Sequence, residues 1–179
     1  FVIVACKTDP SLGAKGISLV IVETGTPGYE KGRNLDKIGQ KAADTSEMFF
    51  ADVRVPVSNL IGEAGKGFGY LMDELPRERL TVAFRAWAEA QRAFEITVEY
   101  TKEREAFGKP LFAQQNTAFS LADVATELAV GWAYLDQCLE KIVAGTLTAK
   151  EGAMAKLWTT EKEAKIVDTC LQFFGGYGY

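Results

Sequence analysis

The chain has 179 residues, a formal net charge of −4, a pI of about 5.0 and 47% hydrophobic residues. It can bury a substantial core, while its acidity argues against a nucleic-acid partner, and the lack of a run of about 20 apolar residues argues against a membrane span. It has no histidine, and its cysteines, Cys6, Cys138 and Cys170, lie far apart, which argues against Cys-His catalysis, a metal site and a disulfide set, and favours a reduced, intracellular setting. Carboxylates are then the expected acid–base groups.

Residues 1 to about 62 have the pattern of β-strands. Apolar, β-branched runs cover residues 1–6 and 17–22, a third covers residues 47–55, and glycines and prolines separate them. Because short polar loops rather than helices join these runs, we expect mostly antiparallel pairing.

Near Gly65 the spacing of apolar residues changes from two to about 3.6, which predicts α-helix. The first helix should end near Gly108 and Pro110. Asn116 is placed to cap a second helix, and Gly145 suits its C-terminal cap.

Thr148 with Glu151 three residues later predicts a capping box at the start of a third helix. Each helix carries one apolar stripe that we expect to face the core. In chain order these stripes are Leu80, Phe84, Trp87, Ala90, Phe94 and Val98; Leu121, Val124, Leu128, Trp132, Leu135, Leu139 and Ile142; and Met154, Leu157, Ala164, Val167, Leu171 and Phe174.

The predicted fold class is α+β by segment. An antiparallel β portion, residues 1–62, precedes an antiparallel helical bundle, residues 63–179. The chain opens inside an apolar run without an initiator methionine and closes inside a glycine-aromatic turn. We therefore expect a piece of a larger protein, with the bundle domain truncated.

Glu78 is the candidate catalytic base. It lies at the entrance to the first helix, shares a helix face with Glu74 and is flanked by Arg77 and Arg79. A desolvated carboxylate in a water-poor cleft, with its pKa raised, could accept a proton from carbon. The alternative is a solvated charge cluster in a first helical turn, where acids complement the helix dipole.

Arg104 and Phe107 are candidates for binding a nucleotide. A guanidinium binds a pyrophosphate through paired hydrogen bonds, and a nearby aromatic ring can cover an adenine. The alternative is a helix C-terminus at which Arg104 complements the dipole and Gly108 forms the cap.

Residues 172–179 read Gln-Phe-Phe-Gly-Gly-Tyr-Gly-Tyr. Adjacent glycines let a backbone approach a planar ligand closely, and Gln172 could hydrogen-bond to that ligand. A plain helix stop with aromatic packing is the alternative. It explains Gly175 but does not require Gly176 as well.

Taken together, these segments resemble the acyl-CoA dehydrogenases, most closely the long-chain type, over essentially the whole chain. The resemblance also rests on residues 35–39 (Leu-Asp-Lys-Ile-Gly), on Asp44 with Thr45, and on residues 52–56 (Asp-Val-Arg-Val-Pro). It implies a subunit with an N-terminal helical domain, a central β domain and a C-terminal four-helix domain. This chain would hold the later part of the β domain and three helices, without the flavin-facing Trp-x-Thr stretch.

The resemblance also implies roles for single residues. Glu78 matches the base of the long-chain and isovaleryl members, whereas in other members the base stands on a loop near the C-terminus. FAD is the implied cofactor, and a neighbouring subunit supplies the contacts that match Arg104, Phe107, Gln115, Gln172, Gly175 and Gly176. The positions that match substrate contacts are Ala14 and Lys15, towards CoA, and Pro76, Arg77 and Arg79.

The implied reaction is α,β-dehydrogenation of a fatty acyl-CoA in fatty acid β-oxidation, with electrons passed to electron-transferring flavoprotein. A homo-oligomer, a dimer of dimers, in a bacterial cytoplasm or a mitochondrial matrix is implied, with acyl chain length and branching left open. We expect the chain alone to be inactive, because part of its flavin pocket would be absent. The alternatives are an acyl-CoA oxidase or flavin monooxygenase on the same fold, and a non-catalytic helical assembly module.

Overall fold

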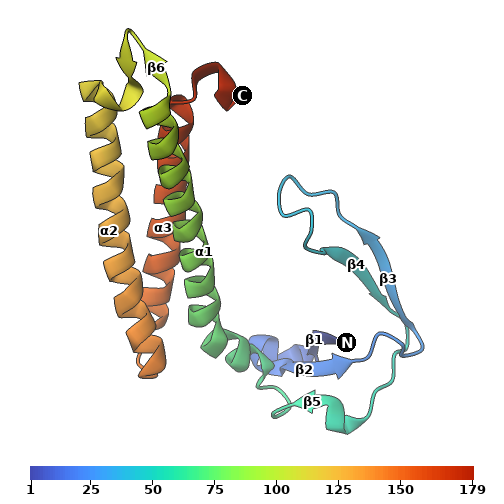
Figure 1. Ribbon diagram of the computed structural model, residues 1–179. Helices are drawn as coiled ribbons and strands as arrows, with labels where there is room; N and C mark the ends of the chain where they lie inside the picture. Colours follow the sequence, from blue (N-terminus) through green and yellow to red (C-terminus); the bar gives the residue numbers. More distant parts are fainter. The chain divides into compact units, whose positions relative to one another are not determined.

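The computed structural model describes all 179 residues as two compact units, Phe1–Asp73 and Glu74–Tyr179 (Figure 1). The longest helix, α1 (Gly67–Glu103), begins in the first unit and continues in the second. The division into domains at residues 62 and 63 stays a prediction.

The first unit consists of strands and two 3-10 helices. They are β1 (Val2–Lys7), η1 (Pro10–Gly16), β2 (Ile17–Val22), β3 (Tyr29–Asn34), β4 (Ser46–Phe50), η2 (Val57–Asn59) and β5 (Leu60–Ile61). One sheet has the order β1-β2-β5, and β3 pairs with β4 in a second. Every pair is antiparallel, which confirms the predicted pairing.

Two details of the strand prediction are wrong. The strand expected over residues 47–55 ends at Phe50, because the chain turns at Asp52, whose φ is +50°. The strand β3 was not predicted, since its sequence Tyr-Glu-Lys-Gly-Arg-Asn has no alternation of apolar residues. Backbone pairing with β4, with Tyr29 opposite Phe50, defines it instead.

The second unit is a helical bundle. Its elements after α1 are β6 (Glu105–Ala106), β7 (Lys109–Pro110), η3 (Leu111–Ala113), α2 (Gln115–Val143), α3 (Ala149–Gln172) and η4 (Gly175–Gly178). The three helices lie side by side and alternate in direction (Figure 1), because short connections join them. The predicted antiparallel bundle is confirmed.

Trp87 is the centre of the bundle core. Its side chain is fully buried and packs against Trp158 in a tilted arrangement, with 5.0 Å between ring centroids. It also donates a hydrogen bond from Nε1 to the carbonyl oxygen of Leu128 at 3.1 Å. Gly131 on α2 makes room for this indole, since a Cβ there would lie 2.1 Å from Trp87 Cζ2. All three helices contribute the buried cluster, which comprises Leu80, Ala83, Trp87, Ala90, Val124, Leu128, Leu135, Cys138, Ala155, Ile166 and Cys170.

The start of α2 differs from the prediction, and its end does not. The helix begins at Gln115, one residue before the expected Asn116 cap, with Gln114 at the N-cap position. At the other end Gly145 has φ +68° and donates to the carbonyl oxygen of Ile142, while Thr146 N–H donates to that of Lys141. This is the Schellman arrangement that a glycine after a helix favours.

Most of the stripe predicted to bury α3 faces outward, whereas its last residue, Phe174, is half-buried. Met154, Leu157 and Leu171 are exposed, and so is Ala164 between them. The buried side of α3 carries smaller residues instead: Gly152, Ala155, Thr159, Ile166 and Cys170. Small side chains let the helix lie close to its neighbours, so packing selects them over the larger apolar row. The equivalent correction on α2 is Leu139, which is exposed while the adjacent Cys138 is buried.

Candidate functional site

A pocket opens at the end of the bundle where α1 finishes and the chain leaves α3. Its volume is about 490 Å³. Tyr100 and Arg104 line one side, and the segment from Gln172 to Tyr177 lines the other. In Figure 1 this is the end at which the chain terminus lies beside α1 and the β6 hairpin.

An aromatic stack joins the two sides of this pocket. The rings of Tyr100, on α1, and Phe174, after α3, lie 4.3 Å apart with 20° between their planes. Backbone hydrogen bonds fix Arg104 in turn: its N–H donates to the carbonyl oxygen of Tyr100, and its own carbonyl oxygen accepts from Leu111 N–H, both at 2.8 Å. These bonds fix the backbone that carries the guanidinium, although Arg104 follows the last residue of α1.

Phe107 stands at the tip of the small hairpin β6–β7. Phe107 and Gly108 have φ values of +55° and +77°, as a two-residue type I′ turn requires. The ring is 97% exposed. Gln114 Nε2, 3.5 Å from the carbonyl oxygen of Ala106, contacts the base of the hairpin. The predicted helix end at Gly108 is thus a hairpin turn, and α1 stops earlier, at Glu103.

Four of the six residues expected to contact a cofactor line this one pocket: Arg104, Gln172, Gly175 and Gly176. Phe107 and Gln115 do not line it. Gln115 is the first residue of α2 and is exposed. Tyr100 and Phe174 were missed as site residues, although their aromatic character beside Arg104 and Gly175 was a usable signal.

Glu78 lies on an exposed part of α1, within the second unit. Beside it Glu74 pairs with Arg77 across 3.6 Å, an exposed i, i+3 ion pair. Pro76 is buried and Arg79 is half-buried. Within this chain the carboxyl group of Glu78 is therefore open to solvent, and the water-poor cleft proposed for it is not formed by these residues alone.

Ala14 and Lys15 belong to the first unit, in η1. Asp9 caps this short helix by accepting hydrogen bonds from Ser11 N–H at 2.9 Å and Ser11 Oγ at 2.6 Å. These two bonds hold the pKa of the Asp9 carboxyl below its usual range. Both Ala14 and Lys15 are exposed, so an ordered loop presents them to solvent.

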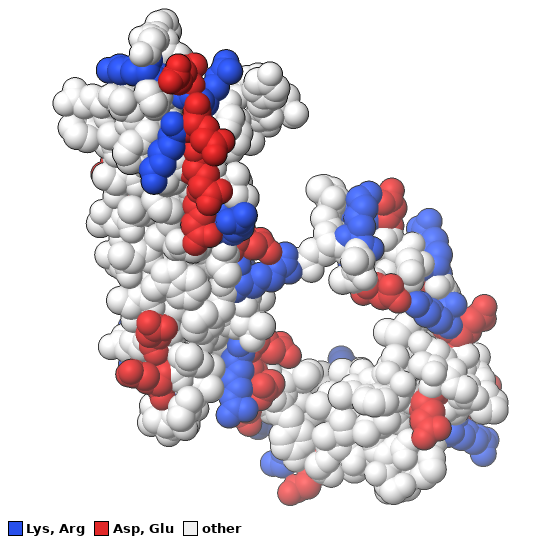
Figure 2. Space-filling model, in the orientation of Figure 1, with Lys and Arg blue, Asp and Glu red and all other residues white.

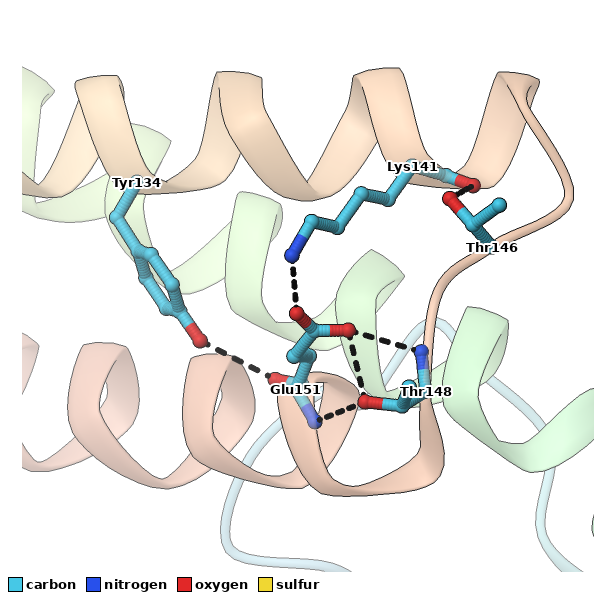
Figure 3. A network of polar contacts seen from close by, with 5 residues as sticks. All are labelled: Tyr134, Lys141, Thr146, Thr148 and Glu151. Carbon is cyan, nitrogen blue, oxygen red and sulfur yellow. Dashed lines mark hydrogen bonds and ion pairs between the residues drawn. The ribbon is translucent and has the colours of Figure 1, made fainter.

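A polar network ties the end of α2 to the start of α3 (Figure 3). Glu151 accepts hydrogen bonds from Thr148 N–H at 3.0 Å and from Lys141 Nζ, and its own N–H donates to Thr148 Oγ1 at 3.2 Å. Chiefly because of Lys141, the pKa of Glu151 falls to about 2. Burial raises the pKa of Tyr134, whose hydroxyl reaches the carbonyl oxygen of Glu151, to about 12.

The capping box of Thr148 and Glu151 is confirmed. Lys141 was not foreseen as its third member, because the sequence pattern says nothing about which α2 residue lies nearby. The network is a structural clamp at the α2–α3 junction, since every polar group in it is satisfied by another member.

The acidic side chains along α1 form an exposed helix face. Glu95, Glu99 and Glu103 recur at every fourth position of α1, and Figure 2 shows acidic side chains gathered along this part of the helix. Arg92 pairs with Glu95 at 3.4 Å, and such i, i+3 ion pairs are common on exposed helix faces.

The chain offers no cluster of three or more His, Cys, Asp or Glu residues for a metal ion. None of its helices is long and apolar enough to cross a membrane.

Comparison with known proteins gives these features a family context. The family described as acyl-CoA dehydrogenase, C-terminal domain, matches residues 65–179. The chain belongs to the acyl-CoA dehydrogenase family. A relative in Sus scrofa, the mitochondrial long-chain specific acyl-CoA dehydrogenase, is 46% identical over 166 residues, which are 93% of this chain and 39% of that protein.

Solved structures share the fold of this chain. An acyl-CoA dehydrogenase from Geobacillus kaustophilus matches with a TM-score of 0.94 and 47% identity, over 99% of this chain and 47% of that one. A structure described as the electron transferring flavoprotein of Acidaminococcus fermentans matches with a TM-score of 0.94 and 36% identity, over 99% and 47%. The chain thus spans less than half the length of these relatives.

The family match confirms the resemblance drawn from the motifs. The family's members are flavoproteins. The matched proteins include mitochondrial and bacterial ones.

Proposed function

We propose that the protein to which this chain belongs catalyses FAD-dependent α,β-dehydrogenation of fatty acyl-CoA thioesters. The observation that carries the proposal is the pocket in which Arg104 meets Gln172, Gly175 and Gly176. Arg104 follows the end of α1, whereas the other three lie at or after the end of α3, some 70 positions further along the sequence. A plain helix stop would not need an arginine and a glycine pair to share one cavity.

The pocket fits part of a dinucleotide. Arg104 offers paired donors for a pyrophosphate, and Gly175 and Gly176 leave their backbone open to a flat ligand, since a Cβ on either would meet nothing within 4 Å. Phe107 and Gln115 lie outside this pocket; in the proposal the Phe107 ring would cover a base, and Gln115 and Gln172 would add polar contacts. Bound FAD would accept the hydride from the β-carbon of the substrate.

Glu78 is the proposed base for the α-proton. Its neighbours Pro76, Arg77 and Arg79 would contact the acyl-CoA, and Ala14 and Lys15 would contact the CoA portion. Because Glu78 is exposed in this chain, parts of the protein that correspond to the rest of its relatives must exclude water from it. That desolvation raises the basicity of a carboxylate and strengthens the hydrogen bonds that acidify the α-carbon.

The proposed site is completed by a neighbouring subunit. The Arg104 pocket would serve the cofactor of the adjacent copy, which makes a dimer the smallest active form and a dimer of dimers the expected assembly. Electron-transferring flavoprotein is the proposed acceptor of the electrons.

Substitution of Glu78 by Gln in the full-length protein tests the base. The amide keeps the shape of the side chain but accepts no proton, so flavin reduction by acyl-CoA should slow by at least roughly a hundredfold. Glu74→Gln is the matched control on the same helix face and should keep the parent rate. A Glu78→Gln protein that bleaches its flavin at the parent rate would show that the base lies elsewhere, for instance on a loop near the C-terminus.

Substitution of Arg104 by Ala tests the cofactor pocket. The variant should lose FAD during gel filtration, because a charge-assisted contact to phosphate is removed. Arg92→Ala removes an exposed arginine from α1, the helix that ends just before Arg104, and is the control. Equal FAD content in the two variants would contradict the proposed role of Arg104.

A further inference from the structure

Gly152 on α3 touches the backbone of Pro76 on α1. A Cβ built on Gly152 would lie 2.9 Å from the carbonyl oxygen of Pro76 and 3.0 Å from its Cα. Both residues are buried. Nothing but a hydrogen atom fits between the two helices here, so the contact is one of backbone against backbone.

The turn of α1 at Pro76 depends on such support. Pro76 lies inside the helix, where a proline has no N–H to donate to the carbonyl four residues earlier and its ring crowds that carbonyl. Helices bend at such positions. The turn that carries Arg77, Glu78 and Arg79 therefore follows a position that lacks one backbone hydrogen bond, and contacts from outside the helix help to hold it.

The α3 side of the contact is fixed. Gly152 follows Glu151, and its N–H donates to the carbonyl oxygen of Thr148 at 3.1 Å. Thr148 and Glu151 form the capping box, and Lys141 of α2 pairs with Glu151 (Figure 3). Thr148, Glu151 and Lys141 thus hold the first turn of α3 in place. Because Gly152 in this turn touches the backbone of Pro76, the turn also restrains Pro76.

We propose that Gly152 is a positioning residue for the catalytic turn, acting through Pro76 on the direction in which Glu78 points. This inference rests on the proposed function of Glu78. Gly152 touches neither substrate nor cofactor. Its lack of a side chain sets the distance between α3 and the Pro76 turn, and with it the distance from the base to the α-carbon.

The test compares Gly152→Ala and Gly152→Val with Ile166→Val in the full-length protein loaded with FAD. The first two insert atoms between the helices, whereas Ile166→Val loosens a buried site of the same helix without touching Pro76. The added Cβ must displace the Pro76 turn by several tenths of an ångström. Because small misplacements of a catalytic group slow a reaction steeply, kcat per bound FAD should fall roughly tenfold in Gly152→Ala and further in Gly152→Val.

Two further readouts separate positioning from stability. With acyl-CoA deuterated at the α-carbon, the isotope effect on flavin reduction should rise in Gly152→Ala and stay at the parent value in Ile166→Val. In the protein without substrate, hydrogen exchange of the peptide that covers residues 74–80 should be faster in Gly152→Ala. FAD content should stay within about twofold of the parent, since the residues of the Arg104 pocket are kept.

The outcomes distinguish the two proposals. If Glu78→Gln abolishes flavin reduction while Gly152→Ala keeps the parent kcat, isotope effect and exchange rates, the positioning role is wrong and the base stands. If Gly152→Ala and Ile166→Val both lower only the unfolding temperature, Gly152 is structural alone. Should Gly152→Val fail to fold, Gly152→Ala, the smaller change, decides.

Discussion

Gly131 offers the sharpest prediction for the bundle core. Its missing side chain leaves the space that the Trp87 indole fills, and a Cβ there would lie 2.1 Å from Cζ2, 2.2 Å from Cε2 and 2.5 Å from Nε1 of that ring. These distances are far inside van der Waals contact. In Gly131→Ala the indole must move, which disturbs its hydrogen bond to Leu128 and its tilted contact with Trp158.

The expected loss of stability follows from three contributions. Forcing a methyl group into a packed core costs about 1–3 kcal/mol. Leaving the buried indole N–H without its acceptor costs about 1–3 kcal/mol more. Alanine in place of glycine inside a helix returns about 1 kcal/mol. We expect Gly131→Ala to lower the free energy of unfolding by about 3 kcal/mol on these figures.

Urea unfolding followed by far-ultraviolet circular dichroism measures this change. Trp87→Phe, which removes the atoms nearest to Gly131, should destabilise the protein by itself but tolerate Gly131→Ala better than the parent does. The two substitutions should therefore couple by more than about 1 kcal/mol. An unchanged or higher urea midpoint in Gly131→Ala, or simple additivity in the double variant, would refute the steric argument.

Three further predictions concern titration, cap geometry and thiols. The pKa of Glu151 is about 2 in the folded protein against 4.5 for the free group. The stabilising effect of its carboxylate is therefore complete above about pH 4.5 and is lost as the pH falls towards 2. In an acid titration followed by circular dichroism, the stability of Glu151→Gln should depend less on pH than that of the parent. Gly145→Ala places a Cβ at φ +68° and should lower the urea midpoint by an amount equivalent to about 1 kcal/mol. Burial raises the pKa values of Cys138 and Cys170, so at pH 8 a thiol reagent should label Cys6 first and the other two only after unfolding; three equally fast thiols would contradict the buried placement.

The helices show how much of the fold the sequence pattern can predict. The sequence pattern predicts three helices, their antiparallel order, the Gly145 cap and the capping box at Thr148, because these depend on local geometry and short connections. It fails for the buried side of α3. That helix has one apolar row with Leu157 and another with Ile166, and the choice between them depends on how closely its neighbours approach.

The strands and the hairpin fail for a different reason. β3 has no apolar alternation and exists because its backbone groups pair with those of β4. The tip of β6–β7 reads Phe107-Gly108, where an aromatic residue occupies a left-handed conformation that favours Asn or Asp. The hairpin therefore has no strong signal against the longer helix that the sequence predicts, and β3 has no strand signal of its own.

The candidate site could be predicted in part from the sequence. Arg104 and the glycine pair after α3 are distant in the chain, and their meeting in one pocket follows from helix lengths that match within the bundle. The stack of Tyr100 on Phe174 was not predictable, because it requires the rotation of α1 and α3 about their axes. The exposure of Glu78 within this chain matches the alternative of a solvated charge cluster, which the sequence already offered.

The outward row of α3 also governs how the protein behaves in solution. Met154, Leu157 and Leu171 expose apolar side chains along a strip that Glu161 and Asp168 interrupt, and ammonium sulfate strengthens the association of apolar surfaces. Retention on a phenyl-substituted resin should therefore be strong and should drop when Leu157 is replaced by Lys. Purification schemes for this chain can exploit that strip, whereas concentrated stocks at high sulfate will precipitate early.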